Sequence, residues 1–324
     1  MTKARENSDY TGLAADIVAG DTAARAGRKN LILNGGFDVW QRGTSFSGYN
    51  FYTSDRWKCS VGAVPTTFTV DKEVQTDGTV AALVVNNSTS ICDYHQRIER
   101  GANITSGKSI TASFDIWGDA TDLILKIGTG TSANNVTTQT ISVPTTRTRQ
   151  SVNVTVPTYT SSIDSMLRLS FSFNNKNCTV RIANVQLELG SVATDFEHRS
   201  YGEELALCQR YYCNNFPTGT TPANGLSINP QGVAGWTTFS STAARSPFIY
   251  YPVTMRATPS LTLYSCTNDT SGQWGIYTGS WDGSSGQASE GTNKHFNVRI
   301  DNGISGASNQ SYLMRGNWTA DAEL

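Results

Sequence analysis

The chain carries little charge and almost no charge imbalance. Charged residues make up 16% of its 324 residues, and 25 Lys and Arg stand against 26 Asp and Glu, for a formal net charge of −1. Proteins that bind DNA or RNA carry a basic excess that neutralises phosphates. We therefore expect no nucleic-acid partner.

The chain also lacks a long hydrophobic run. No stretch of apolar residues approaches the ~18 that a membrane-spanning helix needs. The start, MTKAREN, is polar and has no apolar segment of the kind found in a signal peptide. We therefore expect no membrane insertion, and synthesis in a cytoplasm without export directed by this N-terminus.

Cysteine is sparse, and its six copies are scattered along the chain. None forms a Cys-x-x-Cys pair, and none lies near a histidine at the spacing of a zinc site. We expect free thiols. A local disulfide between Cys208 and Cys213 is the alternative, provided that the chain turns sharply between them.

Recognisable catalytic motifs are missing as well. The three histidines lie far apart, and the chain has no Gly-x-Ser-x-Gly, His-Glu-x-x-His or P-loop. A glycan-degrading enzyme needs two carboxylates roughly 5 to 10 Å apart in a groove. We interpret the local carboxylate groups as turn-capping or solvent-facing side chains, and expect no enzyme and no catalytic residue. These groups are Asp115, Asp119 and Asp122, and Asp195 and Glu197.

Many short segments of alternating polar and apolar residues are separated by Gly, Asn and Ser. Such alternation predicts an all-β protein. Between residues 30 and 199 the strands have the number and rhythm of a jelly-roll β-sandwich. The predicted strands cover residues 31–33, 68–74, 80–85, 109–117, 123–127, 139–143, 150–156, 166–173 and 179–189.

The pattern changes after residue 199. Ser200 followed by Glu203 is a capping box, and Leu205 and Cys208 follow at helical spacing, so we predict a short helix at 201–209. A β pattern then returns and predicts a second, smaller, β-sandwich-like domain. We therefore expect an N-terminal segment at 1–29, a jelly-roll domain at 30–199, and a short helix plus distal β domain at 200–324.

Two segments frame the predicted sandwich. Residues 30–46 read NLILNGGFDVWQRGTSF, with TSDRW at 53–57, and residues 185–200 read VQLELGSVATDFEHRS. Together they resemble the carbohydrate-binding-module-like jelly roll of bacteriophage tail fibres and related virion proteins. The segments PVTMRATP at 252–259 and WTADAEL at 318–324 are similar to the distal domain of such proteins.

The resemblance implies a homotrimeric tail-fibre subunit that recognises a host surface polysaccharide. It also implies a virion location, after synthesis in the host cytoplasm and release by lysis. Residues 1–29 are then a docking segment for a phage tail or capsid protein, although from composition alone a disordered tail fits equally well. Two alternatives remain: a capsid decoration or head-fibre protein with a structural or weakly adhesive role and, less favoured, a glycan depolymerase.

One segment has the composition of a sugar-binding loop. Saccharides stack on exposed aromatic rings, and polar groups take their hydroxyls. Trp274, Tyr277 and Trp281 lie in a Gly- and Ser-rich stretch, with Asp282 and Asn293 nearby. We predict these five as ligand-binding residues, against the alternative that the aromatic rings belong to the core or a trimer interface.

A structural calcium ion is the one cofactor that we consider. Carbohydrate-binding jelly rolls often hold one, and Asp38 and the stretch 184–186 are the positions similar to its ligands. Calcium takes six to eight oxygen ligands, and these positions offer few charged ones. We therefore expect no cofactor, with calcium at Asp38 as the alternative. We also predict that Asp55 and Arg56 form a structural ion pair beside Trp57.

Overall fold

The computed structural model describes most of the chain from residue 29 onward. The described residues are 29–61, 68–87, 92–99, 101, 105–129, 136–158, 166–173, 177–226, 236–238, 244–266, 272–277, 281–285, 287–289, 291–300 and 311–324. For 61, 129, 236–238, 244, 273, 275–277, 281–285, 287–289, 311 and 312 the description covers the backbone alone. The predicted docking segment thus lies outside the described residues, apart from Lys29.

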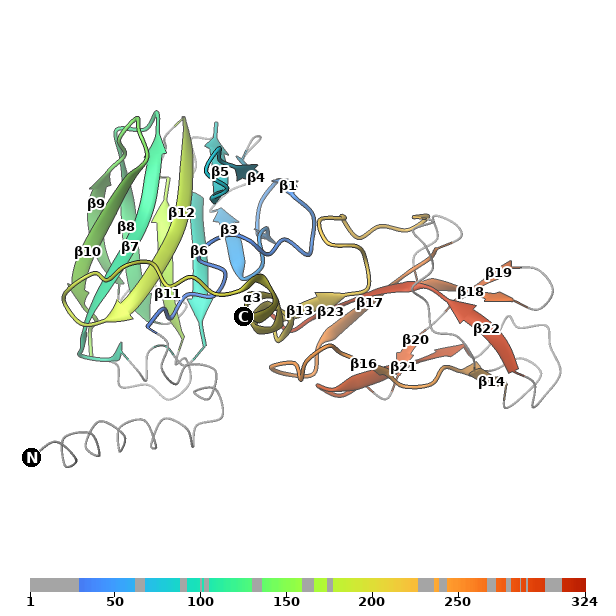
Figure 1. The fold of residues 1–324 in the computed structure, drawn as a ribbon. Helices are drawn as coiled ribbons and strands as arrows, with labels where there is room; N and C mark the ends of the chain where they lie inside the picture. Colours follow the sequence, from blue (N-terminus) through green and yellow to red (C-terminus); the bar gives the residue numbers. More distant parts are fainter. Residues whose placement is uncertain are drawn as a thin grey trace, which may run out of the picture.

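Two six-stranded antiparallel sheets face each other and form a sandwich (Figure 1). Sheet A contains, in spatial order, β1 (Ser45–Ser47), β4 (Phe68–Val74), β5 (Val80–Asn86), β12 (Cys178–Leu189), β7 (Ser109–Gly118) and β10 (Thr148–Thr155). Sheet B contains β2 (Phe51–Tyr52), β3 (Trp57–Val61), β6 (Cys92–Ile98), β11 (Leu167–Ser172), β8 (Asp122–Thr129) and β9 (Val136–Ser142). The predicted jelly-roll-like sandwich is confirmed.

Strand alternation builds the sandwich core. On β7, Ile110, Ala112, Phe114 and Ile116 are all fully buried in one cluster with the inward residues of sheet B, as the sequence predicts. The intervening residues of each strand face outward, because successive side chains point to opposite faces. Each sheet therefore presents an outer face that is free to carry polar chemistry.

The predicted strand at 31–33 is wrong: these residues are irregular. Their backbone groups bond mainly to side chains instead of a complete ladder. Gln96 of β6 accepts from the Leu33 N–H at 2.9 Å and donates to the Leu33 carbonyl at 2.7 Å. Asn30 accepts from the Ile32 N–H at 3.0 Å. Buried backbone groups need partners, and here polar side chains supply them.

A helix and a second β unit follow the sandwich. The helix α3 spans Tyr201–Gln209, and the Ser200 side chain accepts from the Glu203 N–H, so the predicted capped helix is confirmed. A three-stranded sheet contains β13 (Tyr212–Asn214), β23 (Asn317–Asp321) and β17 (Ser260–Tyr264). A larger sheet contains β16 (Ile249–Tyr250), β21 (His295–Ile300), β15 (Ala244–Arg245), β14 (Trp236–Thr238), β22 (Ser311–Arg315), β18 (Gln273–Tyr277) and β19 (Trp281–Ser285), and β20 (Gln287–Ser289) pairs with β21.

The second unit has a hydrophobic core of its own, with Trp274, Phe296, Met314 and Trp318 among its members. All six cysteines are free and buried, which confirms the expected thiols and excludes the Cys208–Cys213 bridge in this structure. No helix among the described residues is long and apolar enough to cross a membrane.

A cluster of buried charges joins the two units; we call Arg42, Asp55, Arg56 and Glu323 the junction charge cluster. Arg56 pairs with Glu323, and Arg42 lies 3.2 Å from Glu323 and 3.5 Å from Asp55. The predicted Asp55–Arg56 pair is therefore wrong in its partners, although both residues are structural. The reason is that Asp55 and Arg56 point to different neighbours: Asp55 also accepts from the Gln41 N–H at 2.7 Å.

Two tyrosines of the second unit cover these guanidinium groups. The Arg42 guanidinium lies 3.5 Å from the ring centroid of Tyr212, and that of Arg56 lies 3.5 Å from the centroid of Tyr211. Burial raises the pKa of Asp55 and lowers the pKa of Arg56. Both directions reflect the cost of removing charge from water, which pairing offsets.

We predict that Glu323→Gln lowers the free energy of unfolding by about 3 to 5 kcal/mol, because Arg56 loses its buried countercharge. The measurement is urea unfolding followed by tryptophan fluorescence. The matched control is Glu73→Gln, which removes the half-exposed pair with Arg181 and should cost at most about 1 kcal/mol. Equal losses in the two variants would contradict a stabilising role for the cluster.

Candidate functional site

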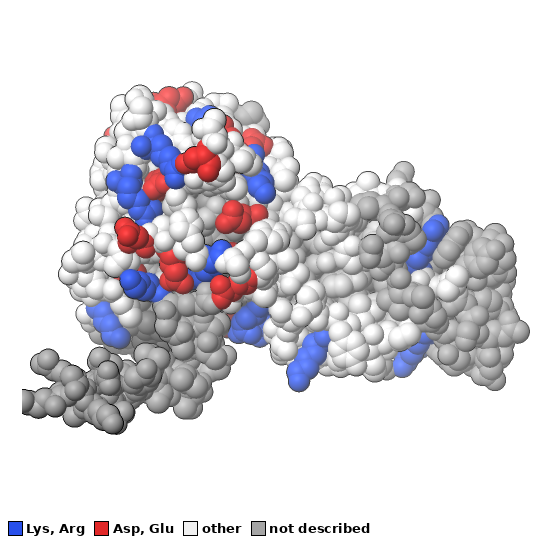
Figure 2. Space-filling model, viewed as in Figure 1, with Lys and Arg blue, Asp and Glu red and all other residues white. Residues whose placement is uncertain are grey.

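The outer face of sheet A carries a polar surface across three strands. The register places Arg149 opposite Asp115 and Ser151 opposite Ser113 on β10 and β7. Residues opposite one another in antiparallel strands have neighbouring side chains on one face. In the view of Figure 2, acidic and basic side chains are interspersed over the sandwich.

A β-bulge in β12 brings a third strand into this surface. The register with β7 shifts between Ala183 and Gln186, and Asn184 has a φ of 48°. Bulges re-aim side chains, and asparagine tolerates positive φ better than most residues. As a result the Asn184 side-chain amide donates to Asp115 Oδ2 at 2.9 Å, and the Asn184 backbone carbonyl accepts from the Arg149 guanidinium.

Ion pairs hold the two arginines of this surface in place. Arg147 donates from Nε and Nη2 to one oxygen of Asp115 at 2.9 and 2.7 Å, and pairs with Asp77 at 2.7 Å. Arg149 lies 3.3 Å from the other Asp115 oxygen and donates to Ser113 Oγ at 2.7 Å. Burial acts to lower the pKa of Arg147, but its bonds with Asp115 and Asp77 outweigh this effect, and the net shift is upward.

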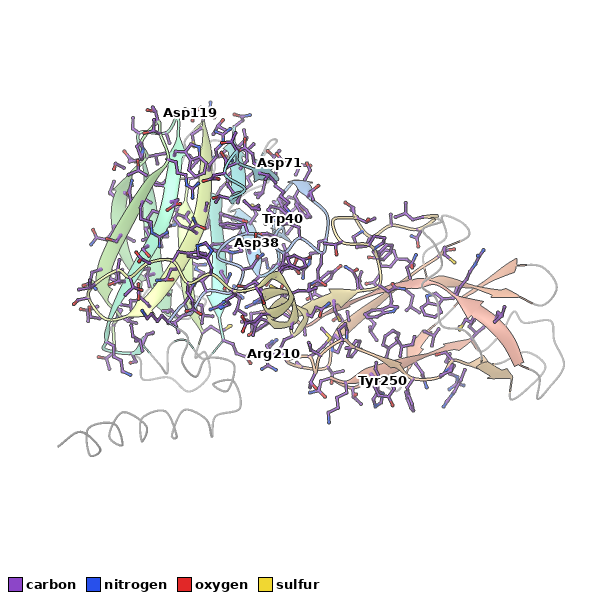
Figure 3. The ribbon with its side chains drawn as sticks, viewed as in Figure 1. Asp38, Trp40, Asp71, Asp119, Arg210 and Tyr250 are labelled. Carbon is purple, nitrogen blue, oxygen red and sulfur yellow. The ribbon has the colours of Figure 1, made fainter. Side chains whose placement is uncertain are left out.

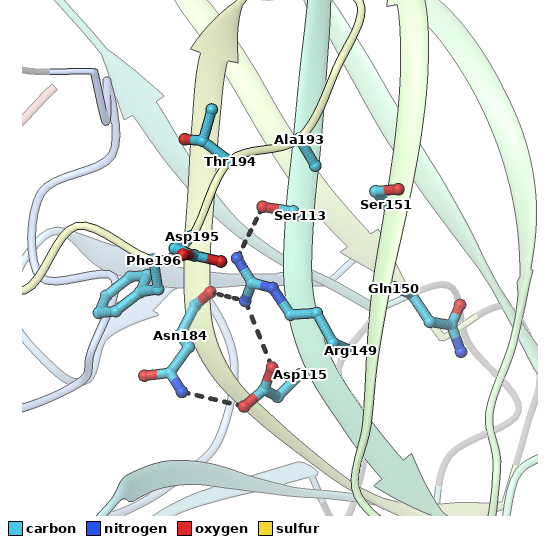
Figure 4. Close-up of a pocket in the computed structure, with 10 residues that line it drawn as sticks. All are labelled: Ser113, Asp115, Arg149, Gln150, Ser151, Asn184, Ala193, Thr194, Asp195 and Phe196. Carbon is cyan, nitrogen blue, oxygen red and sulfur yellow. Dashed lines mark hydrogen bonds and ion pairs between the residues drawn. The ribbon is translucent and has the colours of Figure 1, made fainter.

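A cavity of about 380 Å³ lies over these groups (Figure 4). The segment that follows β12 forms one wall, with Thr194, Asp195 and Phe196 at the cavity. The floor comes from β7, β10 and the bulge. We call this cavity the sheet-A groove; its lining residues are Ser113, Asp115, Arg149, Gln150, Ser151, Asn184, Ala193, Thr194, Asp195 and Phe196.

A second cavity, of about 240 Å³, adjoins the groove and shares Asn184 and Phe196 with it. Asp38, Asp77 and His198 also line it. Asp38 lies on the side of the sandwich next to the second unit (Figure 3). Burial raises the pKa of Asp38, and the nearby charges of Lys72 and His198 oppose that shift.

The structure thus brings together two positions that the sequence singled out for calcium, Asp38 and Asn184, at one cavity. The Asn184 amide nitrogen already donates to Asp115. Among the described residues, no group of three or more His, Cys, Asp and Glu side chains is arranged to hold a metal ion. Calcium at Asp38 stays a prediction.

One of the five predicted ligand-binding residues of the second unit, Trp274, is buried. The Trp274 side chain is 0% exposed, and its Nε1 donates to the Asn317 carbonyl at 3.3 Å. Its ring packs on Gly316, where an added Cβ would lie 2.3 Å from a ring carbon. Trp274 is therefore a core residue, and its prediction as a sugar-stacking residue is wrong.

The other predicted members belong to different parts of the second unit: Tyr277, Trp281 and Asp282 to the β18–β19 hairpin at one end of the larger sheet, and Asn293 to the segment before β21 near its other end. The backbones of Tyr277 and Trp281 pair across the β18–β19 hairpin, and Asp282 pairs with Ile276. The side chains of Tyr277, Trp281 and Asp282 lie outside the description. Asn293 donates to the Met255 carbonyl at 3.4 Å. Ligand binding by these four residues stays a prediction.

The local carboxylate groups mostly bind backbone or arginine. Asp119, at the end of the sandwich remote from α3 (Figure 3), accepts from the Thr179 N–H at 2.6 Å. Glu197 accepts from the Lys29 and Asn30 N–H groups at 2.7 and 2.9 Å. The contacts of Asp119 and Glu197 agree with the capping interpretation. For Asp115 that interpretation is wrong: it is buried within β7, because Arg147 and Arg149 pair with it. Asp195 is exposed and lines the sheet-A groove.

Sequence reasoning missed Arg149 and Ser151, and it considered Asn184 only as a calcium ligand. The signal was weak but present: polar residues alternate with Val152 and Val154 in β10, and an asparagine interrupts the regular alternation of β12. Assembling the groove also required knowing which strands are neighbours, which the sequence did not provide.

No family model and no curated protein matches the chain. Solved structures with a similar arrangement include a domain of tailspike protein 4 from bacteriophage CBA120, with a TM-score of 0.37 and 15% identity over 50% of this chain and 21% of that one. A carbohydrate-binding module in complex with β-1,4-galactotriose has a TM-score of 0.34 and 10% identity over 50% of this chain and 99% of that one. The CBM22-1 xylan-binding domain of Paenibacillus barcinonensis Xyn10C has a TM-score of 0.32 and 11% identity, over 47% and 99%. At these scores the similarities carry no argument about function.

The bulge predicts how Asn184 responds to substitution. Asn184→Val places a β-branched residue at positive φ and should cost about 1 to 3 kcal/mol of stability. Asn184→Gly keeps the backbone conformation and should cost clearly less. Urea unfolding of both variants checks this, and equal losses would mean that the strained backbone does not determine the cost.

Proposed function

We propose that this protein is a phage virion fibre subunit of the tail-fibre type, and that its sandwich binds a host surface glycan in the sheet-A groove. The observation that carries glycan binding is the array of fixed donors and acceptors in that groove. The resemblance of residues 30–46 and 185–200 to virion fibre proteins supports the setting.

The groove chemistry suits a saccharide. Arg149, Asn184 and Ser151 offer planar or hydroxyl hydrogen-bonding groups, and contacts with Asp115 fix Arg149 and Asn184 in advance. Fixed groups lose little entropy when they bind, which favours affinity. Phe196 adds an apolar surface beside them, of the kind that the apolar face of a sugar can contact.

The proposal includes a binding role without catalysis. Asp115, the most buried carboxylate of the groove, is engaged by two arginines and an amide, and so has no free acid–base role. We further propose a homotrimer located in the virion, made in the host cytoplasm and docked through residues 1–29. A capsid decoration or head-fibre role is the alternative setting for the same binding surface.

Glycan binding is tested by titrating host surface polysaccharide fragments calorimetrically into the full chain. Arg149→Met and Phe196→Ala should each weaken binding at least about tenfold, which corresponds to about 1.4 kcal/mol. Arg181→Met is the matched control, because Arg181 lies on the same face and pairs with Glu73 outside the groove. Unchanged binding in both groove variants would refute this site.

The virion setting is tested by deleting residues 2–29 in the phage that encodes the protein. We expect particles with tails but without this protein, because the docking segment is gone. Immunogold labelling of wild-type particles gives its position. Label on capsids alone would overturn the tail assignment in favour of the head-fibre alternative.

A further inference from the structure

The outer face of sheet B carries a row of polar side chains that the sheet-A groove does not use. The register places Lys58 of β3 opposite His95 of β6, His95 opposite Ser170 of β11, and Ser170 opposite Lys126 of β8. Directly opposed residues share a face. Tyr94, the neighbour of His95, is buried in the sandwich core, so this row faces away from the core.

Positive charge gathers along this row. The next row places Arg97 opposite Arg168, so four cations surround His95 and Ser170. One acid, Asp93, is the pairing partner seen for two of them: it lies 3.0 Å from Lys126 and 4.0 Å from Arg168.

Acids at the margins do not balance these cations. Glu99 is held by Arg210 at 3.3 Å and by the Tyr211 hydroxyl at 3.0 Å. Asp321 lies 3.6 Å from Arg42, and its effect on Lys58 is a coulombic attraction that acts to raise the pKa of Lys58. Burial, followed by the charge of Arg97, lowers the pKa of Lys58, as expected for cations held close together.

At the centre of the row lie two buried polar groups without partners. His95 is 1% exposed and Ser170 is fully buried, and neither ring nitrogen of His95 nor the Ser170 hydroxyl makes a hydrogen bond of acceptable geometry. Leaving such a group unsatisfied is unfavourable, because its lost bonds to water are not replaced. Burial, then the charges of Arg168 and Arg97, lower the pKa of His95 to about 3, so the ring is neutral at pH 7 and can donate from one nitrogen.

We propose that this surface is a second binding site of the sandwich, specific for an anionic saccharide that carries carboxylate or sulfate groups. Oxyanions would accept hydrogen bonds from the guanidinium and ammonium groups, directly beside the buried His95 and Ser170. We call it the sheet-B basic row; it consists of Lys58, His95, Arg97, Lys126, Arg168 and Ser170.

The extent of the row favours a saccharide over a free anion. Lys58 and Lys126 are three strand spacings apart, which amounts to about 14 Å. One aromatic ring adjoins the row: Tyr52 of β2 lies opposite Lys58, with its ring centroid 5.2 Å from the Lys58 ammonium. Single-stranded nucleic acid needs several rings on which successive bases stack, so one ring at one end of the row favours a saccharide. The inference goes beyond the proposed function and is independent of it, because none of these residues lines the sheet-A groove.

The test titrates a galacturonic acid trisaccharide into the full chain, with its methyl ester as the uncharged comparison. The acid should bind at least about tenfold more tightly than the ester, and the double variant Lys126→Met/Arg168→Met should lose that advantage. Arg181→Met, which removes a cation of the outer face of sheet A that belongs to neither proposed site, should keep it. Equal binding of acid and ester, or loss of the advantage in Arg181→Met, would overturn the proposal.

A readout on wild-type protein covers the case in which the double variant fails to fold. The imidazole resonances of His95 should shift on addition of the acid trisaccharide and stay in place with the ester. A titration with inorganic sulfate distinguishes a site for small anions from a site for an acidic saccharide. If sulfate shifts the His95 resonances and the acid trisaccharide does not, the site binds only small anions and the saccharide proposal fails. A site that is merely structural would respond to neither.

Discussion

Burial of the Arg42 and Arg56 guanidinium groups between the two β units is the interaction on which their arrangement depends. Each group lies on a tyrosine ring of the second unit and pairs with Glu323. A buried charge that loses its partner costs several kcal/mol, so neither unit can withdraw without exposing or orphaning these charges. Burial of these two guanidinium groups therefore favours a fixed arrangement of the two units.

A buried, paired arginine also stabilises the shape of the sheet-A groove. Arg199, whose side chain is 2% exposed, donates to the Asn30 and Ile32 carbonyls and pairs with Glu204 of α3. These bonds tie residues 30–32, the segment after β12 and the helix to one another. Phe196 lies on the segment after β12. The bonds of Arg199 therefore fix this wall of the groove before a ligand binds.

The sequence pattern was sufficient to predict strands that have one apolar and one polar face. The spans of β4, β7 and β12 follow closely from period-two alternation, and α3 follows from Ser200 and Glu203. It failed where tertiary contacts override composition. Residues 31–33 look like a strand but bond to Gln96, and β6, with its buried His95 and Gln96, does not look like one. Trp274 lies in a Gly-rich segment and is nevertheless buried, because Gly316, which is distant in the sequence, leaves room for its ring. Both proposed sites combine side chains from three or more strands, and strand neighbours cannot be read from periodicity.

Successive side chains of a strand face opposite sides of its sheet, so the residues of the two proposed binding surfaces are distinct from the residues that form the core. Phe114 packs in the core while Ser113 and Asp115 face the sheet-A groove, and Tyr94 packs in the core while His95 belongs to the sheet-B basic row. The two surfaces lie on opposite faces of one sandwich, with the core between them. Substitutions on one face leave the packing and the other face unchanged, because distant sites contribute independently. The sandwich can therefore change its two proposed surfaces separately, by substitutions on one face at a time.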